Sequence, residues 1–172
     1  LVVEPYYPAY FEDVLLAEAV PVTVPLRTQN SRSITLEDLE SKITNKTKMV
    51  WMCNPSNPTG YVWTGEDLEV LAEVAKKHDL IVFADEIYEK LVYDGARHLS
   101  IASLPGMKER TITVNGFSKA YAMTRWRIGY YAAEKTLSET LRTLHYYTAL
   151  CPNAISQEAA LAALTGPQTC VQ

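Results

Sequence analysis

The sequence has little of several features that mark specialised classes of protein. Its 172 residues include only three cysteines and three histidines, with no CxxC pair and no zinc-like spacing between the two types. Positive charge is not in excess, since 16 basic residues face 20 acidic ones without forming a stripe that could neutralise nucleic acid. No apolar run approaches the roughly 20 residues of a membrane span. We therefore expect no metal, no nucleic-acid partner and no membrane partner.

The cysteines and the first residues of the chain set two further expectations. Cys53, Cys151 and Cys170 are odd in number, so we expect structural thiols in a reducing compartment and a cytoplasmic location. The chain starts at Leu1, inside an expected strand and without a charged-then-apolar leader, which suggests a partial sequence. Its hydrophobic content of 48% and charged content of 21% are ordinary for one globular domain with a sizeable core.

Apolar stretches alternate with helical patterns along the chain. Strands are expected at residues 1–3, 22–25, 48–53, 80–84, 111–114 and 128–132. Helices are expected at residues 10–19, from Thr35, from Thr64 to His78, at 134–150 and at 156–164, with a loop over 92–110. Thr35 and Thr64 each precede an aspartate by three residues, as in a capping box. The alternation predicts an α/β fold with three layers, a mostly parallel sheet between helices.

Three polar stretches follow three of these expected strands. They are Asn-Pro-Ser-Asn-Pro-Thr-Gly at 54–60, Ala-Asp-Glu-Ile-Tyr at 84–88, and the stretch at 116–129 that contains Gly-Phe-Ser-Lys. Ligands of open α/β sheets bind outside the carboxyl ends of the strands. Asn57, Asp85 and Lys119 are therefore expected to converge at one edge of the sheet, the one formed by the carboxyl ends of its strands.

Each stretch also has an ordinary interpretation. The loop around Asn57 could be a simple turn, although prolines on both sides of that residue restrict φ and hold its amide in one place. Asp85 could be only a helix N-cap. Lys119 could be a solvent-facing loop lysine, with Arg127 an ordinary surface cation.

In this order and spacing, the three stretches resemble those of the pyridoxal-phosphate-dependent aminotransferases of fold type I, class I/II, which include aspartate, alanine and aromatic aminotransferases. The resemblance implies pyridoxal 5'-phosphate as cofactor, and transfer of an amino group between an amino acid and a 2-oxo acid. It also implies a homodimer in the full-length parent. Residues 1–172 would be a partial large domain, incomplete at both ends, with about 134–172 leading toward an absent small C-terminal domain. We therefore expect little activity from this chain alone.

The resemblance implies a role for each residue at the sheet edge. Lys119 would form the Schiff base with the cofactor and later carry a proton, and burial would favour its neutral amine. Asp85, as a buried carboxylate, would face the pyridine nitrogen and keep it protonated. Asn57 and Tyr88 would meet the phenolic oxygen of the cofactor. Tyr88 would thereby join Lys119 and Asp85 in the catalytic set.

The resemblance also assigns the phosphate to Ser118 and Arg127, the latter through its forked donors. Two nearby positions depart from the family pattern. Gly116 stands where many relatives have Ser or Thr as an additional phosphate ligand. Arg125 stands where relatives usually have Gly. If that site needs a positive φ, Arg carries a penalty of ~1 kcal/mol; alternatively, Arg125 adds a cation near the phosphate.

An aromatic cluster follows the first expected strand and consists of Tyr6, Tyr7, Tyr10 and Phe11. Such residues at a strand end are more often packing than function. In the family, an aromatic residue just after the same proline stacks on the cofactor ring, which makes Tyr7 the candidate and Tyr6 the fallback.

The two glutamates of the second stretch, Glu86 and Glu89, are interpreted as solvated. Rival functions remain open at this point. They are a carbon–sulfur lyase, a cyclopropane-forming synthase or another fold type I enzyme, a non-catalytic module that binds pyridoxal phosphate, and an inactive structural remnant.

Overall fold

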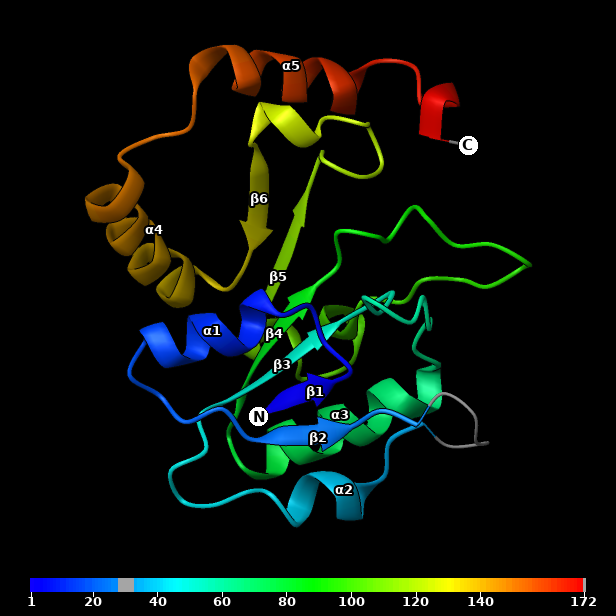
Figure 1. Ribbon diagram of the computed structural model, residues 1–172, viewed down its shortest axis with the longest axis vertical. Helices are drawn as coiled ribbons and strands as arrows, with labels where there is room; N and C mark the ends of the chain where they lie inside the picture. The colour runs from blue at the N-terminus through cyan, green and yellow to red at the C-terminus, as the bar shows by residue number, and fades with distance from the viewer. Residues whose placement is uncertain (28–32, 172) are drawn as a thin grey trace.

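The computed structural model describes residues 1–27 and 33–171 and contains a six-stranded sheet in the order β2-β1-β3-β4-β5-β6 (Figure 1). The strands are β1 (Val2–Glu4), β2 (Thr23–Pro25), β3 (Met49–Cys53), β4 (Ile81–Asp85), β5 (Thr111–Gly116) and β6 (Gly129–Ala132). All neighbouring pairs are parallel except β5 and β6, which form an antiparallel edge. The expected α/β class with a mostly parallel sheet is confirmed.

Helices cover both faces of this sheet. They are α1 (Ala9–Leu16), α2 (Leu36–Glu40), α3 (Gly65–Lys77), α4 (Lys135–Ala149) and α5 (Ala154–Thr165). Side chains alternate between the two faces of a strand, so Val3 packs in one cluster with residues of α2 and α3, whereas Val2 packs in another with Tyr10 of α1. In Figure 1, accordingly, α1 lies on one side of the sheet and α2 and α3 on the other. These are the expected three layers.

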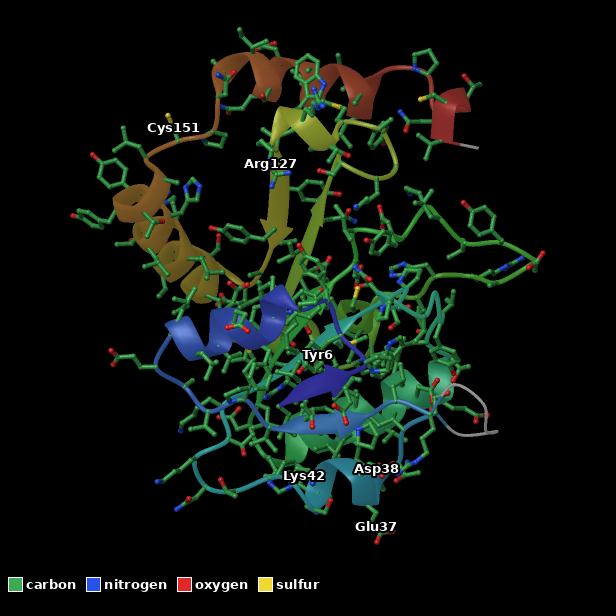
Figure 2. The ribbon with its side chains drawn as sticks, viewed as in Figure 1. Tyr6, Glu37, Asp38, Lys42, Arg127 and Cys151 are labelled. Atoms are coloured by element: carbon green, nitrogen blue, oxygen red, sulfur yellow. The ribbon has the colours of Figure 1, made fainter. Side chains whose placement is uncertain are left out.

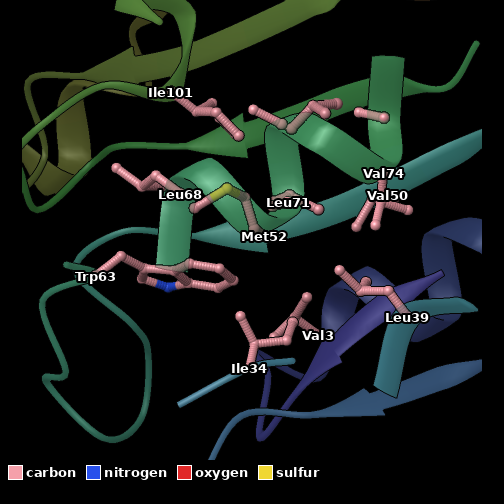
Figure 3. Close-up of a cluster of buried hydrophobic side chains, with 14 of the residues drawn as sticks. Val3, Ile34, Leu39, Val50, Met52, Trp63, Leu68, Leu71, Val74 and Ile101 are labelled. Atoms are coloured by element: carbon pink, nitrogen blue, oxygen red, sulfur yellow. The ribbon is translucent and has the colours of Figure 1, made fainter. Parts of the chain in front are cut away.

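The main hydrophobic core lies between the sheet and α3 (Figure 3). Val50, Met52 and Val82 of the central strands belong to one cluster with Leu68 and Leu71 of α3, and all five side chains are buried. The near-continuous apolar sequence of β3 is typical of a strand that is covered on both faces. The core thus fixes the central strands whose carboxyl ends carry the polar stretches.

Two expected capping boxes are confirmed. In α3, the Thr64 hydroxyl accepts a hydrogen bond from the Asp67 amide at 3.1 Å, and the Asp67 carboxylate accepts one from the Thr64 amide at the same distance. Thr35 and Asp38 form the same reciprocal pair at the start of α2. These bonds satisfy amide groups that have no partner within the helix.

Some expected boundaries differ from the structure. The second C-terminal helix begins at Ala154, because the Asn153 side chain caps it by accepting from the amides of Ile155 and Ser156. The expected loop over 92–110 contains two short 3-10 helices, η1 (Ile101–Ser103) and η2 (Lys108–Arg110). Within residues 1–27 and 33–171, no helix has the length and apolar character needed to cross a bilayer.

Candidate functional site

The three polar stretches lie at the carboxyl ends of three neighbouring parallel strands. Asp85, the last residue of β4, pairs with Cys53 of β3 on one side and with Val114 of β5 on the other. Asn57 follows β3 and Lys119 follows β5, so all three stretches leave the sheet at the same edge. This is the edge at which open α/β sheets bind ligands.

Hydrogen bonds from the buried Asn54 hold the loop that carries Asn57. The Asn54 amide donates to the Leu99 carbonyl at 3.0 Å, and its side-chain oxygen accepts from the Trp63 amide at 3.1 Å. The Trp63 indole in turn donates to the Cys53 carbonyl at 3.1 Å. The loop is therefore attached to the core on both sides of Asn57.

Asn57, Tyr88 and Lys119 come together in space. The Asn57 amide donates to the Tyr88 hydroxyl at 3.4 Å, and the Lys119 ammonium lies 5.6 Å from the centroid of the Tyr88 ring. Backbone bonds from Tyr121 and Met123 to the Phe117 carbonyl close the turn that carries the lysine. The expected burial of Lys119 is wrong, because the described residues leave its side chain exposed.

Asp85 is half-buried and accepts hydrogen bonds on both carboxylate oxygens. The Tyr10 hydroxyl donates to Oδ2 at 2.5 Å, and the Ile87 amide donates to Oδ1 at 3.1 Å. The pKa of the Tyr10 hydroxyl is raised mainly by burial and, to a smaller extent, by the nearby Cys53 and Asp85. The hydroxyl therefore stays protonated and acts as a donor. Burial, followed by the charge of Asp85, likewise raises the pKa of the Cys53 thiol to about 11.

Tyr7 and Tyr6 differ in how much of the side chain is exposed. The Tyr7 side chain is 48% exposed and meets the Tyr10 ring edge to face, with centroids 5.7 Å apart. Tyr6 is half-buried and stacks on Phe11 at 5.9 Å, with the two rings nearly parallel. An exposed aromatic face is what a stacking residue needs, so Tyr7 rather than Tyr6 stays the candidate.

Ser118 and Arg127 are linked through Thr124. The Thr124 hydroxyl donates to the Ser118 carbonyl at 2.9 Å, and Arg127 Nη1 donates to the Thr124 carbonyl at 3.1 Å. Arg127 is exposed and follows the short helix η3 (Thr124–Trp126), near the start of β6 in Figure 2. The guanidinium therefore still has donors available for an anion.

Arg125 does not have the positive φ that would carry a backbone penalty. Arg125 lies within η3, whereas the left-handed residue is Arg127, with φ at 49°. Gly116 has a different reason to lack a side chain. A Cβ atom there would lie 3.1 Å from the Ile87 side chain and 3.2 Å from the backbone of Gly129, its partner across β5 and β6.

The expectation that Glu86 is solvated is also wrong. Its side chain is almost fully buried, and burial raises the pKa of its carboxyl to about 7, with Glu89 and Asp85 adding to the effect. His98 Nε2 is buried 3.6 Å from Glu86, and burial lowers the pKa of this histidine. One ligand atom from each of Glu86, Glu89 and His98 lies within 4.8 Å of the others, a set of atoms that could hold a cation.

The residues at the strand ends fit pyridoxal phosphate as a set. The exposed amine of Lys119 matches the cofactor's aldehyde, and the Asp85 carboxylate matches its ring nitrogen. The Asn57 amide and the Tyr88 phenol, 3.4 Å apart, match its phenolic oxygen. The exposed face of Tyr7 suits an aromatic ring, and the free donors of Arg127 suit a phosphate.

Comparison with known proteins supports this chemistry independently. All of residues 1–172 match the family model described as aminotransferase class I and II. The aspartate aminotransferase of Geobacillus stearothermophilus is 46% identical over 98% of this chain and 43% of that protein. The aromatic-amino-acid aminotransferase 2 of Thermococcus litoralis is 45% identical over 95% of this chain and 42% of that protein.

Solved structures agree with the sequence comparison. The crystal structure of an aromatic aminotransferase from Pyrococcus horikoshii superposes with a TM-score of 0.92 at 44% identity, over 97% of this chain and 45% of that one. N-succinyldiaminopimelate aminotransferase from Mycobacterium tuberculosis gives a TM-score of 0.90 at 36% identity, over 95% of this chain and 43% of that one. The chain thus spans less than half the length of the relatives it matches.

Proposed function

The chain belongs to the aminotransferase class I and II family, and on that premise we propose that it carries the cofactor site of a pyridoxal-phosphate-dependent aminotransferase. The enzyme would move an amino group from an amino acid to a 2-oxo acid. The observation that carries the proposal is the arrangement at the strand ends. Lys119 lies 5.6 Å from the Tyr88 ring, Tyr88 meets Asn57, and Asp85 ends the strand between those that lead to Asn57 and Lys119.

Pyridoxal phosphate, when bound, supplies an electron sink for the bond broken at the substrate Cα. The residues of this chain bind and orient that group. Asp85 places a negative charge against the ring nitrogen, which keeps a proton there. Asn57 and Tyr88 offer an amide and a hydroxyl to the phenolic oxygen, and their 3.4 Å contact holds the two donors together.

Lys119 would supply the primary amine that holds the cofactor's aldehyde carbon, and its Nζ would serve as the atom that carries a proton. Its exposure leaves Nζ accessible to both. Ser118 and Arg127 hold the phosphate, and the bonds through Thr124 keep the two on one turn. The exposed side chain of Tyr7 would cover one face of the cofactor ring.

The test is a half-reaction followed by absorbance. The full-length parent protein is loaded with pyridoxal phosphate and given an amino acid, with aspartate and tyrosine first because the relatives are named for aspartate and aromatic substrates. We expect the aldehyde form of the cofactor to convert to the amine form, and a 2-oxo acid to reverse the change. With cysteine as the amino acid, release of sulfide and ammonia without that reversible conversion would contradict the proposal in favour of a lyase.

A homodimer and a cytoplasmic location remain predictions. The first is implied by the resemblance alone, and the second follows from three free cysteines in the described structure. Relatives named for aspartate, aromatic and N-succinyldiaminopimelate substrates support an amino acid as donor without selecting one.

A further inference from the structure

We propose that Tyr10 is a positioning residue for Asp85 and so acts on the cofactor's ring nitrogen through that carboxylate. The inference rests on the proposed function, since it takes Asp85 to face the nitrogen. Tyr10 belongs to the aromatic cluster after the first strand, and its place in the sequence alone indicates only a packing role. Tyr10 lies on α1 and Asp85 at the end of β4, 75 residues later.

The Tyr10 hydroxyl is one of two donors to the Asp85 carboxylate. The Tyr10 hydroxyl lies 2.5 Å from Asp85 Oδ2, within the range of a charge-assisted bond from O–H to a carboxylate. The Ile87 amide donates to the other oxygen at 3.1 Å. The carboxylate is therefore restrained at both oxygens, and a restrained carboxylate presents its remaining lone pairs in one direction.

The position of the Tyr10 hydroxyl is itself fixed by packing. Its ring is 6% exposed and stacks on Trp51, with centroids 5.0 Å apart. Trp51 packs in turn against Phe83 of the strand that ends at Asp85, with centroids 4.2 Å apart. The hydroxyl thus reaches Asp85 from a ring that has little freedom to move.

Tyr10 also contacts the candidate stacking residue. Its ring meets Tyr7 edge to face at 5.7 Å, so one side chain touches both the carboxylate proposed for the nitrogen and the ring proposed for the cofactor's face. A residue that only fills space needs neither contact. This double contact favours a role in the site over packing alone.

The hydroxyl has two effects on Asp85. A donor to a carboxylate stabilises the ionised form, so the proton between Asp85 and the ring nitrogen stays on the nitrogen. The donor also prevents the side chain from rotating away, and preorganised charge is more effective in catalysis than charge that must first reorient. Removal of the hydroxyl should weaken both effects and leave the ring face of Tyr10 in place.

The test compares Tyr10→Phe with Tyr61→Phe. Tyr61 is a matched control, because its hydroxyl also donates to an aspartate, Asp67 Oδ2 at 2.7 Å, and Asp67 lies on α3. The readout is the ¹⁵N NMR signal of pyridoxal phosphate labelled at the ring nitrogen, bound to the full chain. We expect the Tyr10→Phe signal to move toward that of the unprotonated ring, and the Tyr61→Phe signal to stay at the wild-type position.

A kinetic split should accompany the spectral change. In the full-length parent protein, Tyr10→Phe should lower kcat by about tenfold, the value of one charge-assisted hydrogen bond, while KM changes little. If Tyr10→Phe does not fold, Tyr10→Met fills the same apolar space without a hydroxyl and serves instead.

Reduction with borohydride separates failure of this inference from failure of the proposed function. Labelling of Lys119 with an unchanged ¹⁵N signal in Tyr10→Phe would overturn the role of Tyr10 and leave the cofactor site standing. Equal ¹⁵N shifts in both tyrosine variants would also overturn it, since a general loosening would then explain the data. No labelling of Lys119 in the wild-type protein would contradict the proposed function and, with it, the role of Tyr10.

Discussion

At the residue scale, Glu86 shows how burial beside the site changes acid–base behaviour. Its side chain is 3% exposed and its carboxyl has a pKa of about 7. The unfolded chain would have the ordinary value of 4.5. A carboxyl whose pKa is higher in the folded state stabilises the fold fully below pH 4.5 and loses that contribution as pH rises through 7.

We therefore predict that Glu86→Gln makes the protein relatively more stable as pH rises. The difference in the free energy of unfolding between variant and wild type should grow by about 3 kcal/mol from pH 4 to pH 8, at 1.36 kcal/mol per pKa unit. Burial lowers the pKa of His98, so the contribution of His98 to stability rises with pH. Because His98 is present in both proteins, the quantity to compare is the difference between the stability curves of variant and wild type. Urea titrations at several pH values measure it.

The matched control for this prediction is Glu69→Gln, since Glu69 is an exposed glutamate on α3. The rise with pH for Glu86→Gln should exceed any rise for this exposed control. Equal profiles for the two variants would contradict the raised pKa of Glu86.

The burial of Glu86 was outside the reach of sequence reasoning, whereas the position of Asp85 was within it. Asp85 ends an apolar strand, which is a local pattern. Glu86 is buried by contacts with the loop that follows it, including His98 and Ser100, and no local sequence pattern indicates those contacts. The bond from Tyr10 to Asp85 was missed for the same reason, since 75 residues separate the partners.

At the scale of elements, the start of α3 links several parts of the chain. Asp67 is 4% exposed and accepts hydrogen bonds from the Thr64 amide and hydroxyl and from the Tyr61 hydroxyl. Lys76 and Lys77 near its end complement the helix dipole, and Lys77 also pairs with Glu40 at 2.8 Å. Because α3 carries much of the main core, its cap supports the strands that hold the site.

We predict that Thr64→Ala lowers the free energy of unfolding by about 1 to 2 kcal/mol, because the cap is lost and the buried Asp67 loses a donor. The control is Thr140→Ala in the interior of α4, where the hydroxyl donates to the Thr136 carbonyl of the same helix. That change should stay within about 0.5 kcal/mol. Equal effects of the two variants would contradict a structural role for the cap.

The capping boxes were predictable because their partners are three residues apart, so the sequence contains the whole interaction. The ends of other elements were less so. The start of α5 depends on Asn153, which the sequence suggested only as part of a break between two helices. The 3-10 helix η1 forms where Ile101 reaches the main core, a contact that no local pattern indicates.

At the scale of the whole molecule, burial is distributed unevenly. The main core joins β1 to β4 with α2 and α3, whereas α4 has no buried residue in the described structure. Leu144 and Tyr147 of α4 are 62% and 81% exposed. Local stability follows the apolar contacts that an element makes, so the two regions should open at different free energies.

Hydrogen exchange measured by mass spectrometry should reveal this difference. We predict that amides of β3, β4 and α3 exchange only on global unfolding, while those of α4 exchange far faster under native conditions. Equal protection of α4 and α3 in the same chain would show that the protein covers α4 by contacts beyond those described.

The layered fold could be predicted because alternating strand and helix patterns repeat along the chain, and βαβ units combine in few ways. The register at the site was predictable only in outline. The sequence placed Asn57, Asp85 and Lys119 at strand ends, but their adjacency depends on strand order, which the structure supplies. The exposure of Lys119 depends on how the whole chain packs around the turn.

The central claim is that Lys119 holds pyridoxal phosphate, and one measurement tests it directly. The full chain is loaded with the cofactor and reduced with borohydride, and the modified peptide is located by mass. We predict a label on Lys119 that disappears in Lys119→Ala and persists in the control Lys90→Ala, whose exposed ammonium lies 3.7 Å from Glu89. A folded protein with no label, or with the label on another lysine, would contradict the account.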